Sequence, residues 1–413
     1  MSSTGERQVV IAGGGAAGFF AAITAAELSP GCRIRILEKS PQFLSKVRIS
    51  GGGRCNVTHA CFDVEVLCGF YPRGAAALRG PFRQFQPRDT MAWFEQRGVK
   101  LKIESDGRVF PASDSSASIV DCLMESARRA GVEWVPNCAV ESAVRRSEGG
   151  FDLVLGRGES ASCRKLMLAT GGCRSAALGR VAESLGHHLE PPVPSLFTFH
   201  VAVPWLRELA GISVPDVECA VPGTKLKERG PILVTHQGFS GPSVLRLSAW
   251  GARILHERNY RFALRINWLP RLARAALESD LANLRSRQAA RKISNSPPAG
   301  LPGRLWKGLL FASGISPELR WAGLSRSDQH GLVERLTRME LQVDGRSLNQ
   351  DEFVTCGGVR LGEVDFKTME SRLCPGLYFG GELLDIDGVT GGFNFQSAWT
   401  TGWLAGRALA AES

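Results

Sequence analysis

The sequence predicts an α/β protein in which a parallel β-sheet domain is interrupted by an inserted region. Residues 8–37 read as strand, glycine turn, helix and strand, which is the repeating unit of a parallel sheet. Glycine makes up 47 of the 413 residues and gathers in clusters, as in a chain that repeatedly needs positive φ or a close backbone approach. The length favours two or three domains.

The first glycine cluster predicts a dinucleotide site. Gly13-x-Gly15-x-x-Gly18 lies between a β-branched strand at 8–12 and a helix. In a Rossmann-type fingerprint Gly13 makes the tight turn, Gly15 lets the backbone approach a pyrophosphate, and Gly18 lets the helix pack on the strand. Ala16 and Ala17 belong to the first turn of that helix, whose N-terminus attracts phosphate charge.

An acidic residue follows the second strand, at 33–37, where the fingerprint requires one. Glu38 lies 20 residues after Gly18, and its carboxylate can accept hydrogen bonds from a ribose diol. Its charge disfavours a 2′-phosphate, so the nucleotide is FAD or NAD and not NADP. Lys39 adjoins this acid and joins the candidate site. The alternative is a glycine-rich turn beside a surface glutamate.

The last part of the chain favours FAD, because a nicotinamide dehydrogenase normally has no use for its C-terminus in the cofactor site. A strand leads into a loop of glycines and carboxylates and then into a helix at 394–410. Such a loop suits the ribityl chain of a flavin, and the helix N-terminus favours negative charge at N1 and O2 of the reduced ring. A solvated turn is the alternative. The candidate residues are Gly381, Glu382, Asp387, Gly391, Gly392, Asn394 and Phe395.

Two expectations concern the packing of this terminal helix. Gly392 is expected to lack a side chain because the edge of the flavin ring passes over it. The small residues Gly402 and Gly406 are expected to let the helix pack against a sheet.

A third glycine segment, at 46–56, combines backbone amides with basic side chains and could cradle the pyrophosphate or the flavin. Cys55 and Cys61 invite a redox-pair interpretation, but the five residues between them are one too many for the flavin disulfide reductases. Lys46 and Arg48 could equally be surface charges. The candidate residues are Lys46, Gly51, Gly52, Gly53, Arg54, Cys55 and Asn56.

Two further contacts are expected from small or backbone groups. Thr170 and Gly171 end a strand at 166–169, where the chain can cross close to the dinucleotide. Val140 is expected to make a backbone contact to adenine. No second Gly-x-Gly-x-x-Gly follows a strand, so an NAD(P)H electron donor would have no Rossmann domain of its own.

The middle of the chain indicates the domain organisation. Short strands are expected at 132–135, 139–144, 151–155 and 166–169. Three of them, with Gly149-Gly150 and Gly156 to Gly158 as turns, predict an antiparallel meander over the parallel sheet. A Pro-rich exit follows, then a strand-like region and a helical one that is broken at 295–302. The expected domains are 1–190 with 345–413 for the dinucleotide, 191–268 for a β-rich insert and 269–344 for a helical insert.

Composition excludes several classes of protein. The eleven cysteines include no Cys-x-x-Cys pair, so neither a disulfide framework nor a zinc site is expected, and the seven histidines form no metal pattern. His236, in a glycine-rich turn, is a structural or a catalytic residue. No apolar run is long enough to cross a membrane and no signal peptide is visible, so the protein is expected in the cytoplasm, with no membrane partner.

The net charge of +10 leaves nucleic acid open as a partner. Residues 270–340 hold 12 Lys and Arg against 6 Asp and Glu. The simpler interpretation of this helical region is a solvated basic surface, which makes a nucleic-acid partner the less favoured one.

Together these segments resemble the bacterial BaiN/YhiN-type NAD(P)/FAD-dependent oxidoreductases. The resemblance rests on Gly-Gly-Gly-Ala-Ala-Gly, Ser-Gly-Gly-Gly-Arg-Cys-Asn, Ala-Thr-Gly-Gly, Thr-His-x-Gly-x-Ser-Gly-Pro and Gly-Glu-x-Leu-Asp-x-Asp-Gly-x-Thr-Gly-Gly-Phe-Asn, in that order. It implies a glutathione-reductase-like FAD domain, with a parallel sheet and a β-meander, into which a β-rich domain and a small helical domain are inserted. It also implies that the candidate residues named above surround FAD.

The preferred hypothesis is an FAD-dependent oxidoreductase that transfers a hydride between the flavin and a small organic substrate, with NAD(P)H as electron donor. One alternative is a flavin-dependent RNA-modifying or RNA-binding protein, and another is a non-enzymatic flavin sensor. The sequence assigns no catalytic residue, substrate or oligomeric state.

Overall fold

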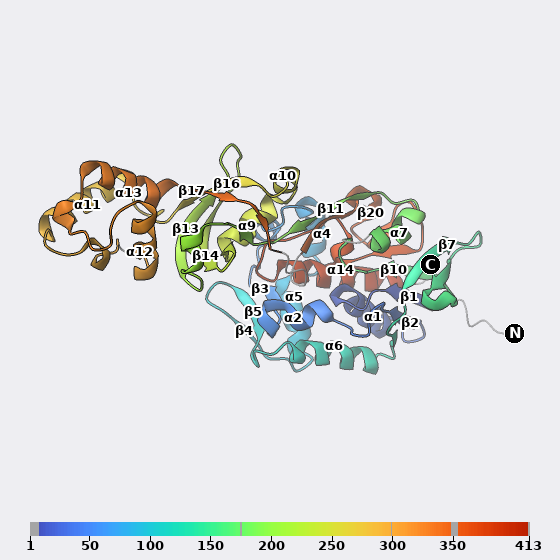
Figure 1. The fold of residues 1–413 in the computed structure, drawn as a ribbon. Helices are drawn as coiled ribbons and strands as arrows, with labels where there is room; N and C mark the ends of the chain where they lie inside the picture. The colour runs from blue at the N-terminus through green and yellow to red at the C-terminus, as the bar shows by residue number, and fades with distance from the viewer. Residues whose placement is uncertain (1–7, 174–175, 299, 348–353, 412–413) are drawn as a thin grey trace. The chain divides into compact units, whose positions relative to one another are not determined.

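The computed structural model describes residues 8–173, 176–298, 300–347 and 354–411. It divides into two compact units, one formed by 1–195 with 350–413 and the other by 196–349 (Figure 1). The first unit therefore contains both ends of the chain. Whether the second unit comprises two domains, divided near residue 269, stays a prediction.

The first unit is built on a seven-stranded sheet in the order β20-β21-β22-β10-β1-β2-β6. The five strands from β22 to β6 are parallel, and β20 and β21 are antiparallel to their neighbours. β1 lies in the middle with Val10 opposite Leu166 and Arg35, and four of its five residues are buried. The strands are β1 (Gln8–Ala12), β2 (Arg33–Leu37), β6 (Glu133–Val135), β10 (Lys165–Leu168), β20 (Val364–Asp365), β21 (Glu370–Ser371) and β22 (Leu377–Phe379).

Three smaller sheets complete the strands of this unit. β7, β8 and β9 form the antiparallel meander, and β11 pairs with β19. The last pairing joins residues 189–195 to the first unit, so the boundary along the chain lies between 195 and 196. The strands are β3 (Thr58–His59), β4 (Leu101–Ile103), β5 (Arg108–Pro111), β7 (Val140–Arg145), β8 (Phe151–Leu155), β9 (Ser160–Cys163), β11 (Leu189–Ser195) and β19 (Val354–Val359).

The helices of the first unit include the first and the last of the chain. The helices are α1 (Ala16–Leu28), α2 (Ser45–Gly53), α3 (Val64–Cys68), α4 (Ala75–Phe82), α5 (Pro87–Glu95), α6 (Ala117–Arg129), α7 (Ala176–Ser184) and α14 (Phe393–Ala410).

The terminal helix α14 packs against α1, and the expectation that its glycines face a sheet was wrong (Figure 1). A Cβ placed on Gly402 would lie 2.6 Å from the Ala17 carbonyl oxygen, and one on Gly406 would lie 2.6 Å from that of Ala21. The two glycines therefore bring the helix backbones together. At the other end of α14, the buried Lys165 of β10 donates to the carbonyl oxygens of Ala408, Leu409 and Ala411, at 3.1, 3.3 and 2.7 Å.

The second unit contains a seven-stranded antiparallel sheet in the order β17-β16-β13-β14-β15-β12-β18. Its strands are β12 (Phe199–His200), β13 (Ser213–Ala220), β14 (Lys227–Thr235), β15 (Gly238–Ser240), β16 (Phe262–Asn267), β17 (Met339–Val343) and β18 (Gly345–Arg346). Its helices are α8 (Pro204–Arg207), α9 (Pro242–Trp250), α10 (Ala252–Glu257), α11 (Arg274–Arg287), α12 (Gly303–Ala312) and α13 (Arg326–Arg338). Figure 1 shows α11, α12 and α13 gathered together within this unit.

Two kinds of feature are absent from the described residues. No helix in that part of the chain is long and apolar enough to cross a membrane. Within the same residues, no group of three or more His, Cys, Asp and Glu side chains could hold a metal ion.

Candidate functional site

The turn between β1 and α1 has the geometry that its glycines predict. Gly13 has φ of +115°, and a Cβ there would lie 2.2 Å from the Ala169 carbonyl oxygen. A Cβ on Gly18 would lie 2.0 Å from the Gly13 carbonyl oxygen. Gly15, by contrast, faces open space, with no atom within 4 Å of a built Cβ, and it begins α1 without a side-chain cap. The turn is thus closed toward the protein at Gly13 and Gly18 and open to a ligand at Gly15.

Glu38 is held in place by the loop around it. One carboxylate oxygen accepts hydrogen bonds from the backbone N–H and the hydroxyl of Ser40, at 2.9 and 2.8 Å, and the other accepts from Gly14 N at 2.8 Å. The side chain is half-buried, and the oxygen that accepts from Gly14 N keeps a second lone pair for a ribose hydroxyl. The sequence did not identify Ser40, and its neighbour Lys39 is exposed.

The meander begins beside this acid. Cys138 N donates to the Glu38 carbonyl oxygen at 2.8 Å. Val140 is half-buried and comes two residues after Cys138, so the start of β7 lies near Glu38. Glu38 and the start of β7 therefore lie where the adenosine of the dinucleotide is expected.

The end of β10 presents a buried polar atom without a partner. The Thr170 hydroxyl is buried and forms no hydrogen bond with any described residue, and the same is true of the Thr355 hydroxyl on β19. Gly171 follows with φ of +79° and open space where a Cβ would stand. Next to it, a Cβ on Gly172 would lie 2.3 Å from the Thr355 hydroxyl and 2.7 Å from a Glu382 carboxylate oxygen. Thr355 gave no signal in the sequence.

The loop after β22 meets the start of α1. Gly381 has φ of +69°, and a Cβ there would lie 3.0 Å from the Ala17 Cβ. Ala16 and Ala17 are almost fully buried in this first turn. Glu382 accepts a hydrogen bond from Thr355 N at 2.8 Å and forms an ion pair with Lys46 of α2. Lys46 and Glu382 are thus paired with each other across 336 positions of sequence.

At the start of α14 the reason for Gly392 is not the expected one. Gly392 has φ of +93°, and a Cβ there would lie 2.5 Å from the Thr58 carbonyl oxygen and 2.8 Å from the Asn56 side chain. With the Asn56 amide assigned from its hydrogen bonds, its oxygen accepts from Gly392 N and its nitrogen donates to Thr58 O, both at 3.0 Å. The protein itself therefore excludes a side chain at Gly392.

Other residues of this loop hold it together. Asn394 bonds both backbone groups of Gly388, accepting from its N–H at 2.9 Å and donating to its carbonyl oxygen at 2.8 Å. A Cβ on Gly391, where φ is +129°, would lie 2.9 Å from the Phe393 ring. Phe395 stacks on Trp399, with 5.7 Å between the ring centres.

Asp387 is fully buried in an ion pair with Arg73. The Ser195 hydroxyl also donates to it, at 2.8 Å. Burial raises the pKa of the Asp387 carboxyl, and the guanidinium of Arg73 opposes that rise. These contacts give Asp387 a structural role in holding the loop to 73 and 195.

The glycine segment of α2 turns left-handed at its end. Gly51, Gly52 and Gly53 have φ of 59°, 68° and 83°, and the last two face open space. The sequence suggested a loop here, whereas the first part is helical. Cys55 follows, fully buried, and burial raises the pKa of its thiol to about 12. Cys55 and Cys61 are both free.

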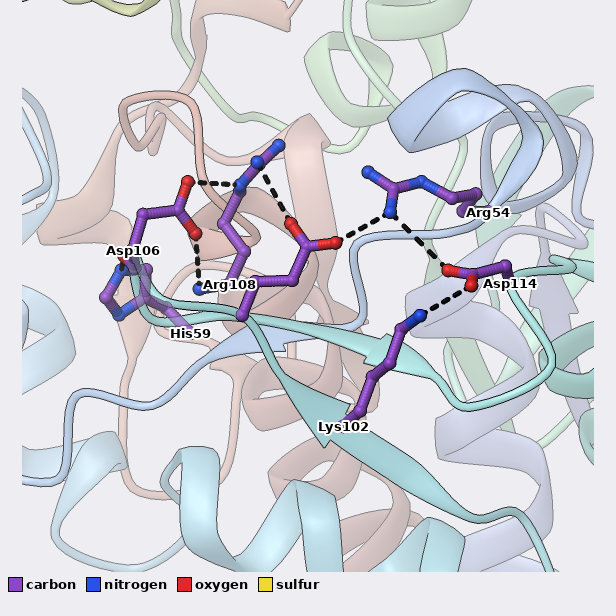
Figure 2. A network of polar contacts seen from close by, with 7 residues as sticks. Arg54, His59, Lys102, Asp106, Arg108 and Asp114 are labelled. Atoms are coloured by element: carbon purple, nitrogen blue, oxygen red, sulfur yellow. Dashed lines mark hydrogen bonds and ion pairs between the residues drawn. The ribbon is translucent and has the colours of Figure 1, made fainter.

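Arg54 belongs to a network of charges on the small sheet of β3, β4 and β5 (Figure 2). Its guanidinium lies 2.7 Å from Glu104 and 3.4 Å from Asp114, and over the Phe110 ring at 4.0 Å. Glu104 also pairs with Arg108 at 3.0 Å. The charge of Arg54 is therefore balanced by carboxylates, although the sequence suggested a contact to the pyrophosphate or the flavin.

His59, at one end of this network, connects it to α14. The His59 ring stacks on Phe393 with 4.8 Å between the ring centres, and its Nε2 lies 3.1 Å from the Asp106 carbonyl oxygen (Figure 2). Its Nδ1 is buried without a hydrogen-bond partner among the described residues. Burial lowers the pKa of His59, and the hydrogen bond to the Asp106 carbonyl group opposes that change. No sequence pattern identified His59.

These residues fit a bound FAD. A turn closed at Gly13 and Gly18 but open at Gly15 can receive a pyrophosphate, and one Glu38 oxygen keeps a lone pair for a ribose hydroxyl. The buried Thr170 and Thr355 hydroxyls have no hydrogen-bond partner among the described residues, and a bound ligand could provide one. The fit favours the adenosine and pyrophosphate part of the cofactor, because the Gly392 amide and Asp387 are engaged within the protein.

Comparison with known proteins places the chain among flavoproteins. The family described as HI0933-like protein Rossmann domain matches residues 7–408. The ribosomal RNA dihydrouridine synthase of Escherichia coli (strain K12) is 33% identical over 411 residues, covering 97% of this chain and 98% of that protein. The 3-dehydro-bile acid delta(4,6)-reductase of Clostridium scindens is 31% identical over 411 residues, covering 98% of this chain and 99% of that protein.

A solved structure shows the same fold. The 3-ketosteroid-delta4-(5alpha)-dehydrogenase from Rhodococcus jostii RHA1 aligns with a TM-score of 0.50 at 16% identity, over 100% of this chain and 99% of that one. The Rossmann-type α/β fold and the resemblance to BaiN/YhiN-type oxidoreductases are thereby confirmed. The chain belongs to the HI0933-like Rossmann flavoprotein family and is an FAD-dependent oxidoreductase.

Proposed function

We propose that this protein reduces a carbon–carbon double bond conjugated to a carbonyl, and that the bond is C5=C6 of uracil in ribosomal RNA. FAD is the cofactor, NAD(P)H is the electron donor, and the reaction takes place in the cytoplasm. One hydride and one proton are added to uridine, which becomes dihydrouridine, while NAD(P)H is oxidised to NAD(P)⁺.

The observation that carries the proposal is that two relatives with related reactions each align with this chain over almost their whole length. One is named a dihydrouridine synthase and the other a reductase of a bile acid with 4,6 double bonds. In uracil the C5=C6 bond is conjugated to the C4 carbonyl, and in a 3-oxo bile acid the 4,6 bonds are conjugated to the 3-carbonyl. Both substrates accept hydride at the carbon far from the carbonyl, so one flavin chemistry serves both.

The charge of this chain supports RNA over a small molecule. The net charge is +10, and the helical segment 270–340 carries twice as many basic as acidic residues. A polyanionic substrate gains affinity from such a field, whereas an uncharged enone does not. The preference for a small organic substrate, which rested on the sequence alone, therefore gives way to the RNA alternative.

The residues described above would hold the cofactor for this reaction. FAD, when bound, supplies the hydride. The loop around Gly14 and Ser40 orients the Glu38 carboxylate toward the adenosine ribose, and the open turn at Gly15 receives the pyrophosphate. Gly171, Gly52 and Gly53 leave room along the backbone, where no Cβ occupies the space.

The experiment uses the FAD-loaded protein under anaerobic conditions. The protein, reduced by NADH or NADPH, is mixed with protein-free ribosomal RNA, and dihydrouridine is measured in the digested RNA by mass spectrometry. We expect dihydrouridine to form in proportion to the NAD(P)H consumed. RNA that gains no dihydrouridine, from an enzyme whose flavin is reduced normally, would refute the RNA substrate.

The second candidate is reduction of an enone in a steroid-like molecule, which the bile acid reductase favours. The same reduced protein is mixed with a 3-oxo-4-ene steroid, and flavin reoxidation is followed by its absorbance. Rapid reoxidation by the steroid, with none by RNA, would establish this candidate in place of the first.

A further inference from the structure

The outer face of α12 combines two cations with an exposed aromatic ring. Arg304, Lys307 and Phe311 follow one another at intervals of three and four residues, so they lie on one face of the helix. All three are exposed, and Phe311, at 68%, is the most exposed large hydrophobic side chain among the described residues. An exposed aromatic ring beside two cations is a combination found on surfaces that bind single-stranded nucleic acid.

The opposite face fixes α12 firmly within its unit. Leu305, Trp306, Leu309 and Leu310 are fully buried, and the Trp306 indole donates to the Ile293 carbonyl oxygen at 2.9 Å. The outer face is thus presented on a rigid platform, and changes on it leave the core intact.

Helix α8 extends the surface on one side. Arg304 donates to the Glu208 carbonyl oxygen at 2.6 Å, and a Cβ on Gly308 would lie 2.8 Å from Leu209 and 3.2 Å from Trp205. Arg207, on α8 itself, is exposed, as is the carboxylate residue Glu208. Helix α8 therefore borders the α12 face at Arg304, with Glu208 as the adjacent acid.

Other cations of the second unit add to this positive charge where no carboxylate is paired with them. Some of its cations are paired, such as Arg271 with Asp216 and Lys292 with Glu318. Exposed cations that form no ion pair with any described residue include Arg287, Arg291, Arg320 and Arg326. Trp321 N donates to the Arg291 carbonyl oxygen at 3.0 Å, so Arg291 and Arg320 lie close in space.

We infer that the outer face of α12, defined by Arg304, Lys307 and Phe311, binds RNA. Arg304 and Lys307 contact backbone phosphates, and Phe311 stacks on an unpaired base. Cations recognise the phosphates, whereas an aromatic ring accepts any base, so the surface secures the RNA without reading its sequence. This inference rests on the proposed function and assigns part of its partner-binding surface.

The test measures RNA affinity on FAD-loaded protein, with fluorescein-labelled oligouridine and with protein-free ribosomal RNA, from about 50 to 300 mM salt. Lys307→Glu should weaken binding about tenfold at the lowest salt and lower the slope of log affinity against log salt by about one. Phe311→Ala should weaken binding about tenfold with little change in that slope, since stacking does not release counterions. Phe311→Trp should restore it.

Two controls accompany these variants. Lys100→Glu makes the same charge change at an exposed position of the first unit, outside α12, and should leave RNA affinity within about twofold of the unmodified protein. The variants should also keep their flavin absorbance and their rate of reduction by NAD(P)H, because the α12 face is not in the cofactor site.

The outcomes separate this inference from the proposed function. If the unmodified protein forms dihydrouridine in RNA but the α12 variants bind RNA as tightly as Lys100→Glu does, the inference is wrong and the function stands. If the unmodified protein neither binds nor modifies RNA, the RNA substrate itself fails. If Lys307→Glu and Phe311→Ala kept their affinity for RNA but lost affinity for a protein, α12 would bind a protein partner and the inference would be wrong.

Discussion

Cys55 illustrates how burial sets the chemistry of a single residue. Its thiol is fully buried, and its pKa is about 12 because the thiolate would lose its hydration. A redox partner of a flavin must form a thiolate near neutral pH, so Cys55 is unsuited to that role.

We expect Cys55→Ser to leave flavin reduction by NAD(P)H unchanged. In the unmodified protein Cys55 should resist iodoacetamide at pH 8, as measured by peptide mass spectrometry. The unfolded thiol has a pKa near 9.0, so above that pH the unfolded state loses its proton first. The raised pKa of Cys55 therefore lowers the free energy of unfolding from about pH 9 to 12, and Cys55→Ala should remove that part of the loss. A Cys55–Cys61 disulfide that forms with flavin oxidation would contradict this prediction.

Glu38 gives the second prediction for a single residue. Glu38→Ala should weaken FAD binding by on the order of 1.5 to 3 kcal/mol, because it removes a charged acceptor of ribose hydrogen bonds. It also releases Gly14 and Ser40, so part of the loss comes from the loop. Glu38→Gln keeps one oxygen acceptor and should lose less. Titration of the apoprotein with FAD by fluorescence measures both, and an affinity unchanged in Glu38→Ala would place the carboxylate outside the site.

The residues that sequence could assign were those whose role depends on backbone geometry. Gly13, Gly15 and Gly18 follow a fixed pattern because a turn, a close approach and a helix contact occur at fixed intervals. The partners of Arg54 and Asp387 could not be predicted, since Glu104 and Arg73 come from segments with no pattern of their own. The positive φ and crowding at Gly392 come from Thr58, 334 positions away in sequence, which no local pattern reveals.

At the scale of elements, the contact between α1 and α14 links the two ends of the chain. Gly402 and Gly406 allow this contact, because a Cβ on either residue would lie 2.6 Å from a carbonyl oxygen of α1. The small residues were visible in the sequence, but the surface they face was not, because a helix and a sheet both accept a stripe of small residues. The third strand of the meander, β9, was also missed because its alternation of small polar residues is weak.

We expect Gly402→Ala to destabilise the protein by about 1 to 3 kcal/mol, because its Cβ overlaps the backbone of Ala17. Ala17 belongs to the first turn of α1, so FAD affinity should fall as well. The matched control is Gly331→Ala in α13, where a Cβ meets no atom within 4 Å and where alanine should stabilise the helix by about 0.5 to 1 kcal/mol. Urea unfolding of both variants distinguishes the contact from helix propensity. Equal stability changes in the two would show that α14 can shift away from α1 freely.

At the scale of the whole molecule, the sequence predicted a first unit that the chain leaves and re-enters. The N-terminal and C-terminal segments of the chain contribute to the same sheet, in which β22 pairs with β10. They also contribute to one helix pair, in which α14 packs on α1. Such long-range pairing follows from the order of the motifs, since the glycine fingerprint and the terminal loop must meet at one dinucleotide. The chain leaves the first unit after residue 195, at the end of the Pro-rich segment, because β11 pairs with β19.

The last prediction tests whether the N-terminal half of the site can stand without the C-terminal segment. A chain that ends at Asp387 lacks α14 and with it the indole of Trp399, which is fully buried and donates to the Val57 carbonyl oxygen at 2.9 Å. It also exposes the buried face of α1 to water and leaves Lys165 without the carbonyl oxygens of Ala408, Leu409 and Ala411. We expect this chain to be unfolded or free of FAD, as shown by circular dichroism and flavin absorbance. A chain that ends at Ala411 keeps all three carbonyl groups and should match the full protein. If the chain ending at Asp387 folded and bound FAD tightly, the glycine turn and Glu38 would suffice for the cofactor, and the contact between α14 and α1 would have no part in holding it.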